Sequence, residues 1–211
     1  MDYLHPTFYF DYTSENMQQL IDEFQNDALS ETDKTVGLYT KVRDAYLYNP
    51  YHISLNPENY RASALAEKPT GNCVEKSIIL IAGLRALGIP ARLRLGKVVN
   101  HIAVERLVEK FGSNELTPHG SVEAYLDGKW LKMSPAFNAS LCEKLNVAPL
   151  EFDGKTDSYL QAYNAEGSRF MEYLEDYGYF EDVPVAFMIK NIKEHYPHIF
   201  DTGQDDLEFK L

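Results

Sequence analysis

Two residues, Cys73 and His119, have the types and surroundings that nucleophilic catalysis requires. Cys73 follows Gly71-Asn72 at the start of an apolar stretch, so it begins a predicted helix. Unpaired backbone N–H groups at that end favour a thiolate and can hold an oxyanion. Glu75 in the same turn and the apolar surroundings oppose ionisation, so a base must help. A histidine can take the thiol proton, and the sequence therefore predicts a nucleophile and base pair.

The segment from Gly71 to Leu87 is the strongest helix prediction and would position Cys73. Asn72 can cap this helix, and Gly88 ends it. Its apolar residues cover most of the circumference, which is typical of a helix inside a core. Cys73 is therefore expected on a rigid, buried element.

A predicted β-hairpin carries His119. Two short runs, residues 118–126 and 129–133, alternate between apolar and polar side chains. They are joined by Asp127-Gly128, a dipeptide that favours tight two-residue hairpin turns.

The register of this hairpin brings Ser134 near His119. A two-residue turn sets Glu123 opposite Lys132, a favourable charge pair, and Ser121 opposite Ser134. Alternation places His119, Ser121, Glu123 and Ser134 on one face. His119 and Ser134 become diagonal neighbours, about 7 to 8 Å apart at the backbone, so their side chains are within hydrogen-bonding reach.

The chain resembles the transglutaminase-like domain over roughly residues 36–138. The matching segments are Gly71-Asn72-Cys73, Leu84-Arg85-Ala86-Leu87-Gly88-Ile89-Pro90-Ala91-Arg92, His119-Gly120-Ser121-Val122-Glu123-Ala124-Tyr125, Gly128-Lys129-Trp130 and Ser134-Pro135. The resemblance implies a papain-like arrangement in which a cysteine attacks a carboxamide or acyl carbon, a histidine acts as base and an aspartate orients it. Cys73 and His119 fall on the first two positions.

The third position departs from the family pattern. Ser134 stands where the family has aspartate before proline, and Ser121 replaces a tryptophan. A serine hydroxyl can accept the ring N–H of the histidine, but it brings no charge to stabilise an imidazolium. Asn138 could serve as orienting residue instead, as an amide does in papain-like sites, or Asp153 or Asp157 could enter from the later segment. Register alone ranks Ser134 first.

The resemblance implies an α+β fold of the papain and transglutaminase type, with N-terminal helices and a buried cysteine helix packed on a small antiparallel β-sheet. Hydrophobic spacing predicts the N-terminal helices at residues 14–27, 32–48 and 57–67 and a strand at 91–99. We expect a single domain over residues 1–211, with its core at about 32–138. Residues 152–211 would form a helical, aromatic extension packed on it, with a helix near 157–177 that carries several tyrosines at near-helical spacing. They are Tyr159, Tyr163, Tyr173 and Tyr177, with Tyr179 just beyond.

Composition excludes several classes of function. The formal net charge of -12 repels polyanions, so nucleic acid is not expected as a partner. Residues 1–12 contain no targeting leader, and the longest aliphatic run, Ile78 to Leu84, is far shorter than the roughly 20 residues of a membrane span. With two cysteines, a disulfide framework is not expected, and we predict a cytoplasmic protein. Nothing in the sequence points to a particular oligomeric state.

The predicted function is cysteine-dependent acyl transfer on amide or peptide bonds of a protein, peptide or small amide, without cofactor or metal. A metal site on Cys73 and His119 is disfavoured because no close second Cys or His accompanies them. Cys142 is interpreted as packing. The alternative is a catalytically inactive binding module, which Ser134 and Ser121 motivate.

Overall fold

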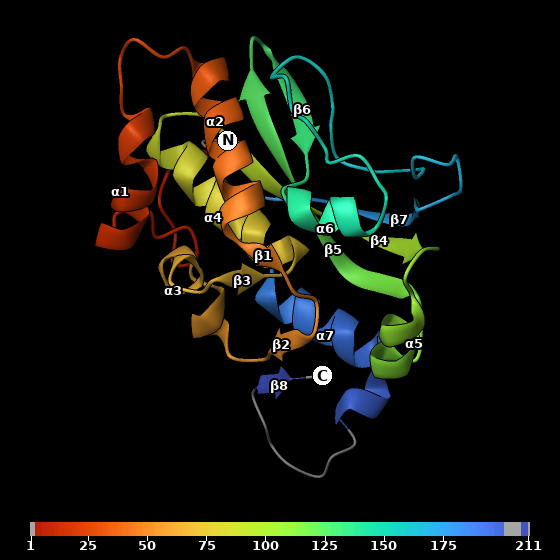
Figure 1. The fold of residues 1–211 in the computed structure, drawn as a ribbon. Helices are drawn as coiled ribbons and strands as arrows, with labels where there is room; N and C mark the ends of the chain where they lie inside the picture. Colours follow the sequence, from red (N-terminus) through yellow and green to blue (C-terminus); the bar gives the residue numbers. More distant parts are fainter. Residues whose placement is uncertain (1–2, 201–207, 211) are drawn as a thin grey trace.

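The computed structural model describes residues 3–200 and 208–210. Helices and strands alternate along the chain, and short 3-10 turns connect several of them (Figure 1). The α-helices are α1 Glu15–Ile21, α2 Glu31–Ala45, α3 Ala62–Ala66, α4 Cys73–Ala86, α5 Glu105–Phe111, α6 Ala139–Lys144 and α7 Val185–His195. The strands are β1 Leu47–Tyr48, β2 His52–Ser54, β3 Thr70–Gly71, β4 Ala91–Asn100, β5 Glu115–Leu126, β6 Lys129–Met133, β7 Met171–Phe180 and β8 Glu208–Lys210.

The cysteine helix α4 forms as predicted. The Asn72 side-chain oxygen accepts the backbone N–H groups of Val74 and Glu75 at 2.9 and 3.0 Å. The Glu75 carboxylate accepts the Asn72 N–H at 2.8 Å, which completes a reciprocal cap. Nearly every residue of α4 is buried, and Gly88 follows the helix with a φ of 80°. This positive φ explains why a glycine ends the helix.

The central sheet is antiparallel, with the strand order β6-β5-β4-β7. The predicted hairpin register is confirmed, since Glu123 lies opposite Lys132 and Tyr125 opposite Trp130. The predicted charge pair does not form, because the buried Glu123 carboxylate binds two arginines of β4 instead. These are Arg92, at 2.6 Å, and Arg94, at 2.8 Å.

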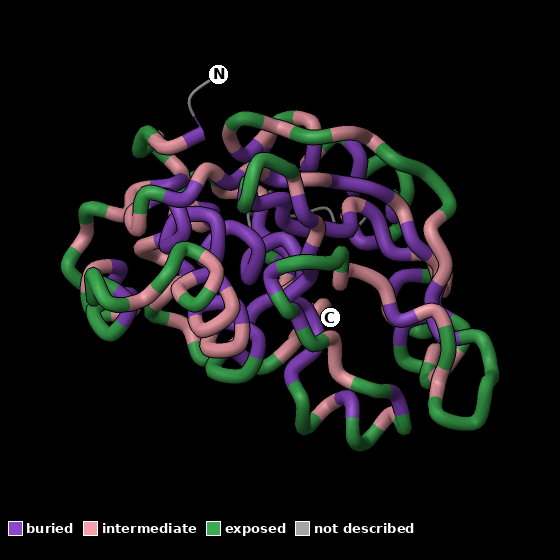
Figure 2. Tube along the Cα trace, turned by 90° about the horizontal axis from the view of Figure 1, so that it is seen from above, coloured by how far each residue is buried: buried purple, intermediate pink, exposed green. Residues whose placement is uncertain are grey.

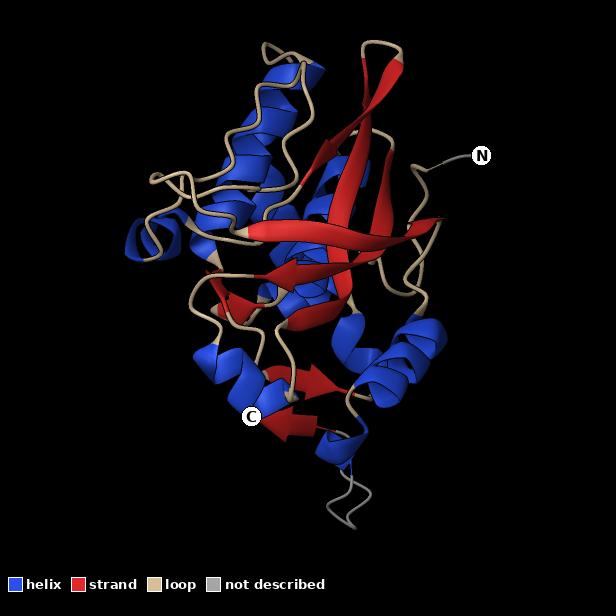
Figure 3. Cartoon of the chain, turned by 90° about the vertical axis from the view of Figure 1, so that its right-hand side faces the viewer, coloured by secondary structure: helices blue, strands red, loops and turns tan. Residues whose placement is uncertain are grey.

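Helix α4 packs against one face of β5 and forms the centre of the core. Val122 and Ala124 are fully buried on this face, and at Gly120 the backbone of the strand approaches Val74 directly. Figure 3 shows the sheet and the helices as neighbouring layers, and in Figure 2 the buried segments lie in the middle of the molecule. The α+β layering is therefore that of the prediction.

The N-terminal helices also lie near their predicted places. Helix α1 is followed by a 3-10 turn at Asp22–Phe24, and α2 begins after Ser30, whose side chain accepts the Asp33 N–H. The third predicted helix is divided into a 3-10 turn at Pro57–Tyr60, capped by Asn56, and the short α3. None of the helices within the described ranges is long and apolar enough to cross a membrane.

The predicted helix near 157–177 is wrong, because Met171–Phe180 is strand β7. Tyr173, Tyr177 and Tyr179 are separated by even numbers of residues, a spacing that suits a strand as well as a helix. Pairing decides between the two, because β7 binds the outer edge of β4 and satisfies its backbone groups. The C-terminal segment thus contributes a strand to the central sheet.

The helix of this region lies later, at α7, which the sequence analysis missed. Val185, Met188 and Ile192 recur at helical spacing after Pro184, and this signal could have identified it. At the end of the described chain, β8 pairs with β2 near the lower end of the molecule in Figure 1.

Candidate active site

Cys73 is the first residue of α4, and the residue is 5% exposed. The backbone just before it is held by a short parallel ladder, in which Tyr48 of β1 pairs with Gly71 of β3. The cap at Asn72 fixes the first helical turn. The thiol is therefore carried by a rigid segment, as predicted.

Burial raises the pKa of the Cys73 thiol to about 11, despite the N–H groups around it. The backbone N–H groups of Gly120, Val74 and Cys73 itself oppose this effect, and the Glu75 carboxylate adds to it. The Val74 and Glu75 N–H groups also donate to the Asn72 cap, so they are not free to hold an oxyanion. The helix terminus alone does not produce a thiolate, and activation requires a base.

The Cys73 sulfur lies at an open edge of β5. Strand β6 pairs with β5 only as far as Val122 and Met133. Backbone N–H groups alternate sides along a strand, and Tyr125 donates toward β4, so Gly120 donates toward the β6 side. Beyond the end of β6, the Gly120 N–H meets the Cys73 sulfur at 3.4 Å.

This contact places the thiol beside His119, the residue that precedes Gly120. A backbone nitrogen lies about 2.4 Å from the preceding Cα, so the sulfur is within about 6 Å of the His119 Cα. The His119 ring is on the opposite face of the sheet from α4, with its centroid 6.1 Å from that of Tyr173. The structure therefore brings the two predicted residues to the same edge of β5.

No hydrogen bond joins the thiol and the imidazole in the described part of the chain. His119 is 2% exposed, and neither of its ring nitrogens has a partner there. Burial lowers the pKa of His119 to about 4, so thiol and imidazole are both neutral at pH 7. A buried polar atom without a partner costs about 1–3 kcal/mol.

The candidate third residues lie apart from the His119 nitrogens. Ser134 is buried, and its backbone N–H donates to Ser158. The Asn138 side chain accepts the Tyr48 N–H at 3.0 Å and donates to Ser140 at 2.8 Å, so both ends of its amide are engaged.

Neither aspartate of the later segment reaches His119. Asp153 accepts the N–H groups of Lys155 and Thr156, and Asp157 accepts the Lys132 N–H. Ser121, at the family's tryptophan position, lies near Tyr173 and partly offsets the rise that burial causes in the pKa of the Tyr173 hydroxyl. The orienting role of Ser134 stays a prediction from register.

Lys76, one turn after Cys73, supports the site and was not predicted from the sequence. Its fully buried ammonium group donates to the carbonyl oxygens of Arg43, at 2.8 Å, and Ala136, at 2.7 Å. Burial lowers the pKa of Lys76 to about 7. Lys76 ties the segment after Ser134 to α2 and α4. A lysine inside a mainly apolar, buried helix was the signal available for it.

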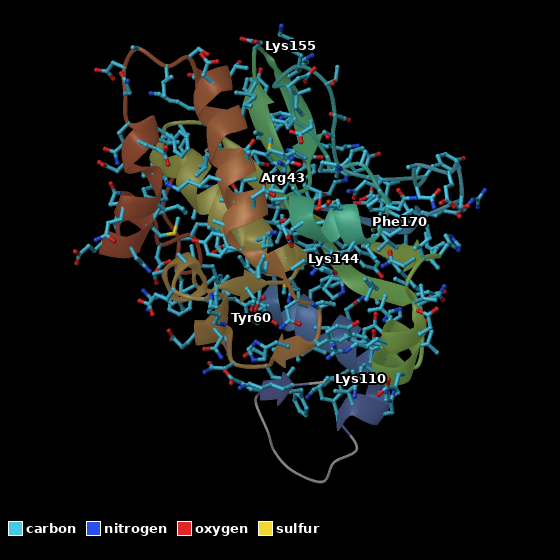
Figure 4. The ribbon with its side chains drawn as sticks, in the orientation of Figure 1. Arg43, Tyr60, Lys110, Lys144, Lys155 and Phe170 are labelled. Atoms are coloured by element: carbon cyan, nitrogen blue, oxygen red, sulfur yellow. The ribbon has the colours of Figure 1, made fainter. Side chains whose placement is uncertain are left out.

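A pocket lined in part by Cys73 encloses about 540 Å³ of empty space including open solvent. Its walls are mainly apolar and come from β1, α5, β5 and the C-terminal helix α7. Tyr60 forms part of the wall, and Figure 4 shows it beside β3, at the end of α4 that carries Cys73. No charged side chain is among the described residues that line it.

The second cysteine, Cys142, and the possible metal ligands lie as follows in the structure. Cys142 in α6 is fully buried and accepts a hydrogen bond from Gln161 at 3.4 Å, an environment that agrees with packing. Within residues 3–200 and 208–210, no group of three or more His, Cys, Asp or Glu side chains is arranged to hold a metal ion.

A family model of the Transglutaminase-like superfamily matches residues 18–135, more than half of the chain. The chain therefore belongs to this superfamily. The crystal structure of a Cytophaga hutchinsonii protein named a putative cysteine protease is similar, with a TM-score of 0.52 at 19% sequence identity. The similarity covers 88% of this chain and 48% of that one, so this chain spans about half its length. At this identity the likeness shows the fold, while no curated protein matches the chain.

Proposed function

We propose that the protein is a cysteine-dependent acyl-transfer enzyme that acts on amide or peptide bonds, with Cys73 as nucleophile and His119 as base. The observation that carries the proposal is the Gly120 N–H bound to the Cys73 sulfur, since it fixes the thiol next to the residue that bears the imidazole. Membership of the Transglutaminase-like superfamily supports the same chemistry. A protein, peptide or small amide is the proposed substrate.

The reaction starts from the neutral pair. As the Cys73 sulfur attacks the carbonyl carbon, His119 takes the thiol proton and becomes imidazolium. The imidazolium gives this proton to the leaving amine, and a thioester remains on Cys73. Water then attacks the thioester, His119 takes a proton from it, and the acid is released as the thiol regains a proton. Hydrolysis is proposed over transfer to an amine, in line with the name of the Cytophaga hutchinsonii protein.

Proton transfer requires the His119 ring to turn toward the strand edge. The ring is bound by no hydrogen bond in the described structure, so this rotation breaks none. Ser134 is the proposed orienting residue, accepting the second ring N–H when the imidazole is protonated. Its neutral hydroxyl stabilises the imidazolium less than a carboxylate would, so we expect a slow enzyme.

The test is hydrolysis of N-acetyl amino acid p-nitrophenyl esters by the wild type and by Cys73→Ala, His119→Ala and Cys142→Ala. Turnover should disappear in Cys73→Ala and fall by at least about 100-fold in His119→Ala, the usual contribution of a general base. Cys142→Ala is the matched control and should keep it. Undiminished turnover in Cys73→Ala would rule out the proposal.

A second candidate function is binding without catalysis. The absence of a hydrogen bond between Cys73 and His119 in the described structure favours it, as does Ser134 in place of aspartate. This alternative predicts that the wild type turns over no ester, while wild type and Cys73→Ala bind the same amides with equal affinity.

A further inference from the structure

The walls of the pocket beside Cys73 are apolar and uncharged. Aromatic and aliphatic side chains dominate them, and the described residues contribute no Asp, Glu, Lys, Arg or His. The lining side chains include Phe111, Leu116, Ile192, Tyr48 and Tyr196, together with Ile53 from β2. The protein as a whole carries a charge of -12, so this uncharged surface is a local departure from its composition.

Several polar atoms at the wall are already engaged. The Tyr196 hydroxyl accepts the Thr117 N–H and donates to the Glu115 carbonyl, both at 2.9 Å. The Thr117 hydroxyl donates to Asn191 at 2.8 Å. The Tyr60 hydroxyl donates to the Ser54 carbonyl at 2.7 Å. A charged group that entered here would lose its water without gaining these partners.

We propose that this pocket holds the acyl-side chain of the substrate and selects aromatic and branched aliphatic groups over charged ones. The inference rests on the proposed function and names the substrate class of the same site. Cys73 is itself among the residues that line the pocket, so the group that stays attached to it in the thioester lies next to this space. Transfer of an apolar acyl group from water to the pocket is favourable, whereas transfer of a charged group is opposed by the cost of its desolvation.

The C-terminal part of the chain contributes to this selection. Met188 and Ile192 of α7 reach the pocket, and Ile53 belongs to the strand that pairs with β8. Ile192 lies on the wall, while Ile189, on the same helix, is half-buried and packs against the main hydrophobic core. The two isoleucines therefore offer a matched pair of variants, one inside the pocket and one outside it.

The experiment compares kcat/KM of the wild type for N-acetyl p-nitrophenyl esters of phenylalanine, leucine, glycine, lysine and glutamate. Phenylalanine and leucine esters should exceed the glycine ester by at least about 10-fold, the discrimination that an apolar pocket supplies. The lysine and glutamate esters should fall below glycine. Ile192→Phe fills the pocket and should remove most of the phenylalanine preference, whereas Ile189→Phe should keep it.

Binding to Cys73→Ala separates this inference from the proposed function. In an NMR titration, N-acetylphenylalaninamide should bind this variant at least about 10-fold more tightly than N-acetylglycinamide. Turnover without side-chain preference would overturn the inference and leave the proposed function standing. Selective binding to the variant without turnover by the wild type would overturn the proposed function and leave the pocket's selectivity standing. Equal binding of the two amides would overturn the inference directly.

Discussion

The close approach of Gly120 to α4 should be essential for placing the thiol. An added Cβ at position 120 would lie 2.7 Å from the Val74 Cα and 3.0 Å from the Val74 nitrogen. Ordinary contact begins at 3.4 Å, so the first turn of α4 must move by about 0.7 Å. The obstacle is backbone, which cannot turn away as a flexible side chain can. Gly120→Ala therefore moves the turn that carries Cys73.

The expected losses follow from this displacement. Overpacking of this size costs about 1–3 kcal/mol of the free energy of unfolding. The N–H contact to the Cys73 sulfur is already 3.4 Å long, so further separation removes it. A shift near 1 Å at a reacting group costs about 100-fold in rate. We predict such a loss in kcat/KM for the phenylalanine ester.

Gly83→Ala is the matched control. Its added Cβ would also lie at 2.7 Å, but from a methyl group of Leu38, which can move. Gly83 is on the same helix, about 15 Å along the axis from Cys73. Urea unfolding checks that both variants are folded. Ester hydrolysis should then show full activity for Gly83→Ala and lost activity for Gly120→Ala. Wild-type activity in Gly120→Ala would refute the placement of the thiol against this strand.

Four further predictions concern the protonation of His119, the orienting role of Ser134 and the support from Lys76. Activity should stay constant from about pH 6 to pH 9 and fall only near the His119 pKa of about 4, because neutral imidazole is the base. A fall in activity near pH 6.5 would contradict the burial of the His119 imidazole. In the unfolded chain this histidine binds a proton below about pH 6.5, whereas the buried His119 does so only near pH 4. The free energy of unfolding should therefore fall by about 3 kcal/mol between pH 6.5 and pH 4. Urea unfolding should detect this fall in the wild type and not in His119→Phe. Ser134→Asp should raise kcat at least about 10-fold by stabilising the imidazolium, and an unchanged or lower kcat in the folded variant would remove Ser134 from its proposed role. Lys76→Met should lower the free energy of unfolding by about 2–5 kcal/mol, because two buried carbonyl oxygens lose their donor. A loss below about 1 kcal/mol would show that the Lys76 hydrogen bonds are dispensable.

Much of the site's framework could be predicted because its signals are local. Asn72 and Gly88 define the ends of α4, and Asp127-Gly128 defines the hairpin with its register. Each of these depends on the backbone preferences of a few adjacent residues. The positions of Cys73 and His119 on their elements follow from them.

The C-terminal strand and the pocket could not be predicted in the same way. The spacing of the tyrosines in β7 fits both a helix and a strand. Pairing with β4, which is distant in the sequence, determines that the segment is a strand. The pocket likewise combines residues of β1, α5, β5 and α7, and no local sequence pattern predicts that these elements lie next to one another. The partners of Glu123 also depend on tertiary pairing, because β4 presents two arginines where the hairpin alone offers Lys132.

The central claim is tested most directly by trapping the acyl-enzyme. The wild type, His119→Ala and Cys73→Ala are mixed with the N-acetylphenylalanine ester, quenched with acid within milliseconds to seconds and analysed by peptide mass spectrometry. We predict an N-acetylphenylalanyl thioester on the peptide that contains Cys73, formed at least about 100-fold more slowly in His119→Ala and absent from Cys73→Ala. An adduct confined to Cys142, or one that forms on Cys73 equally fast without His119, would contradict the account.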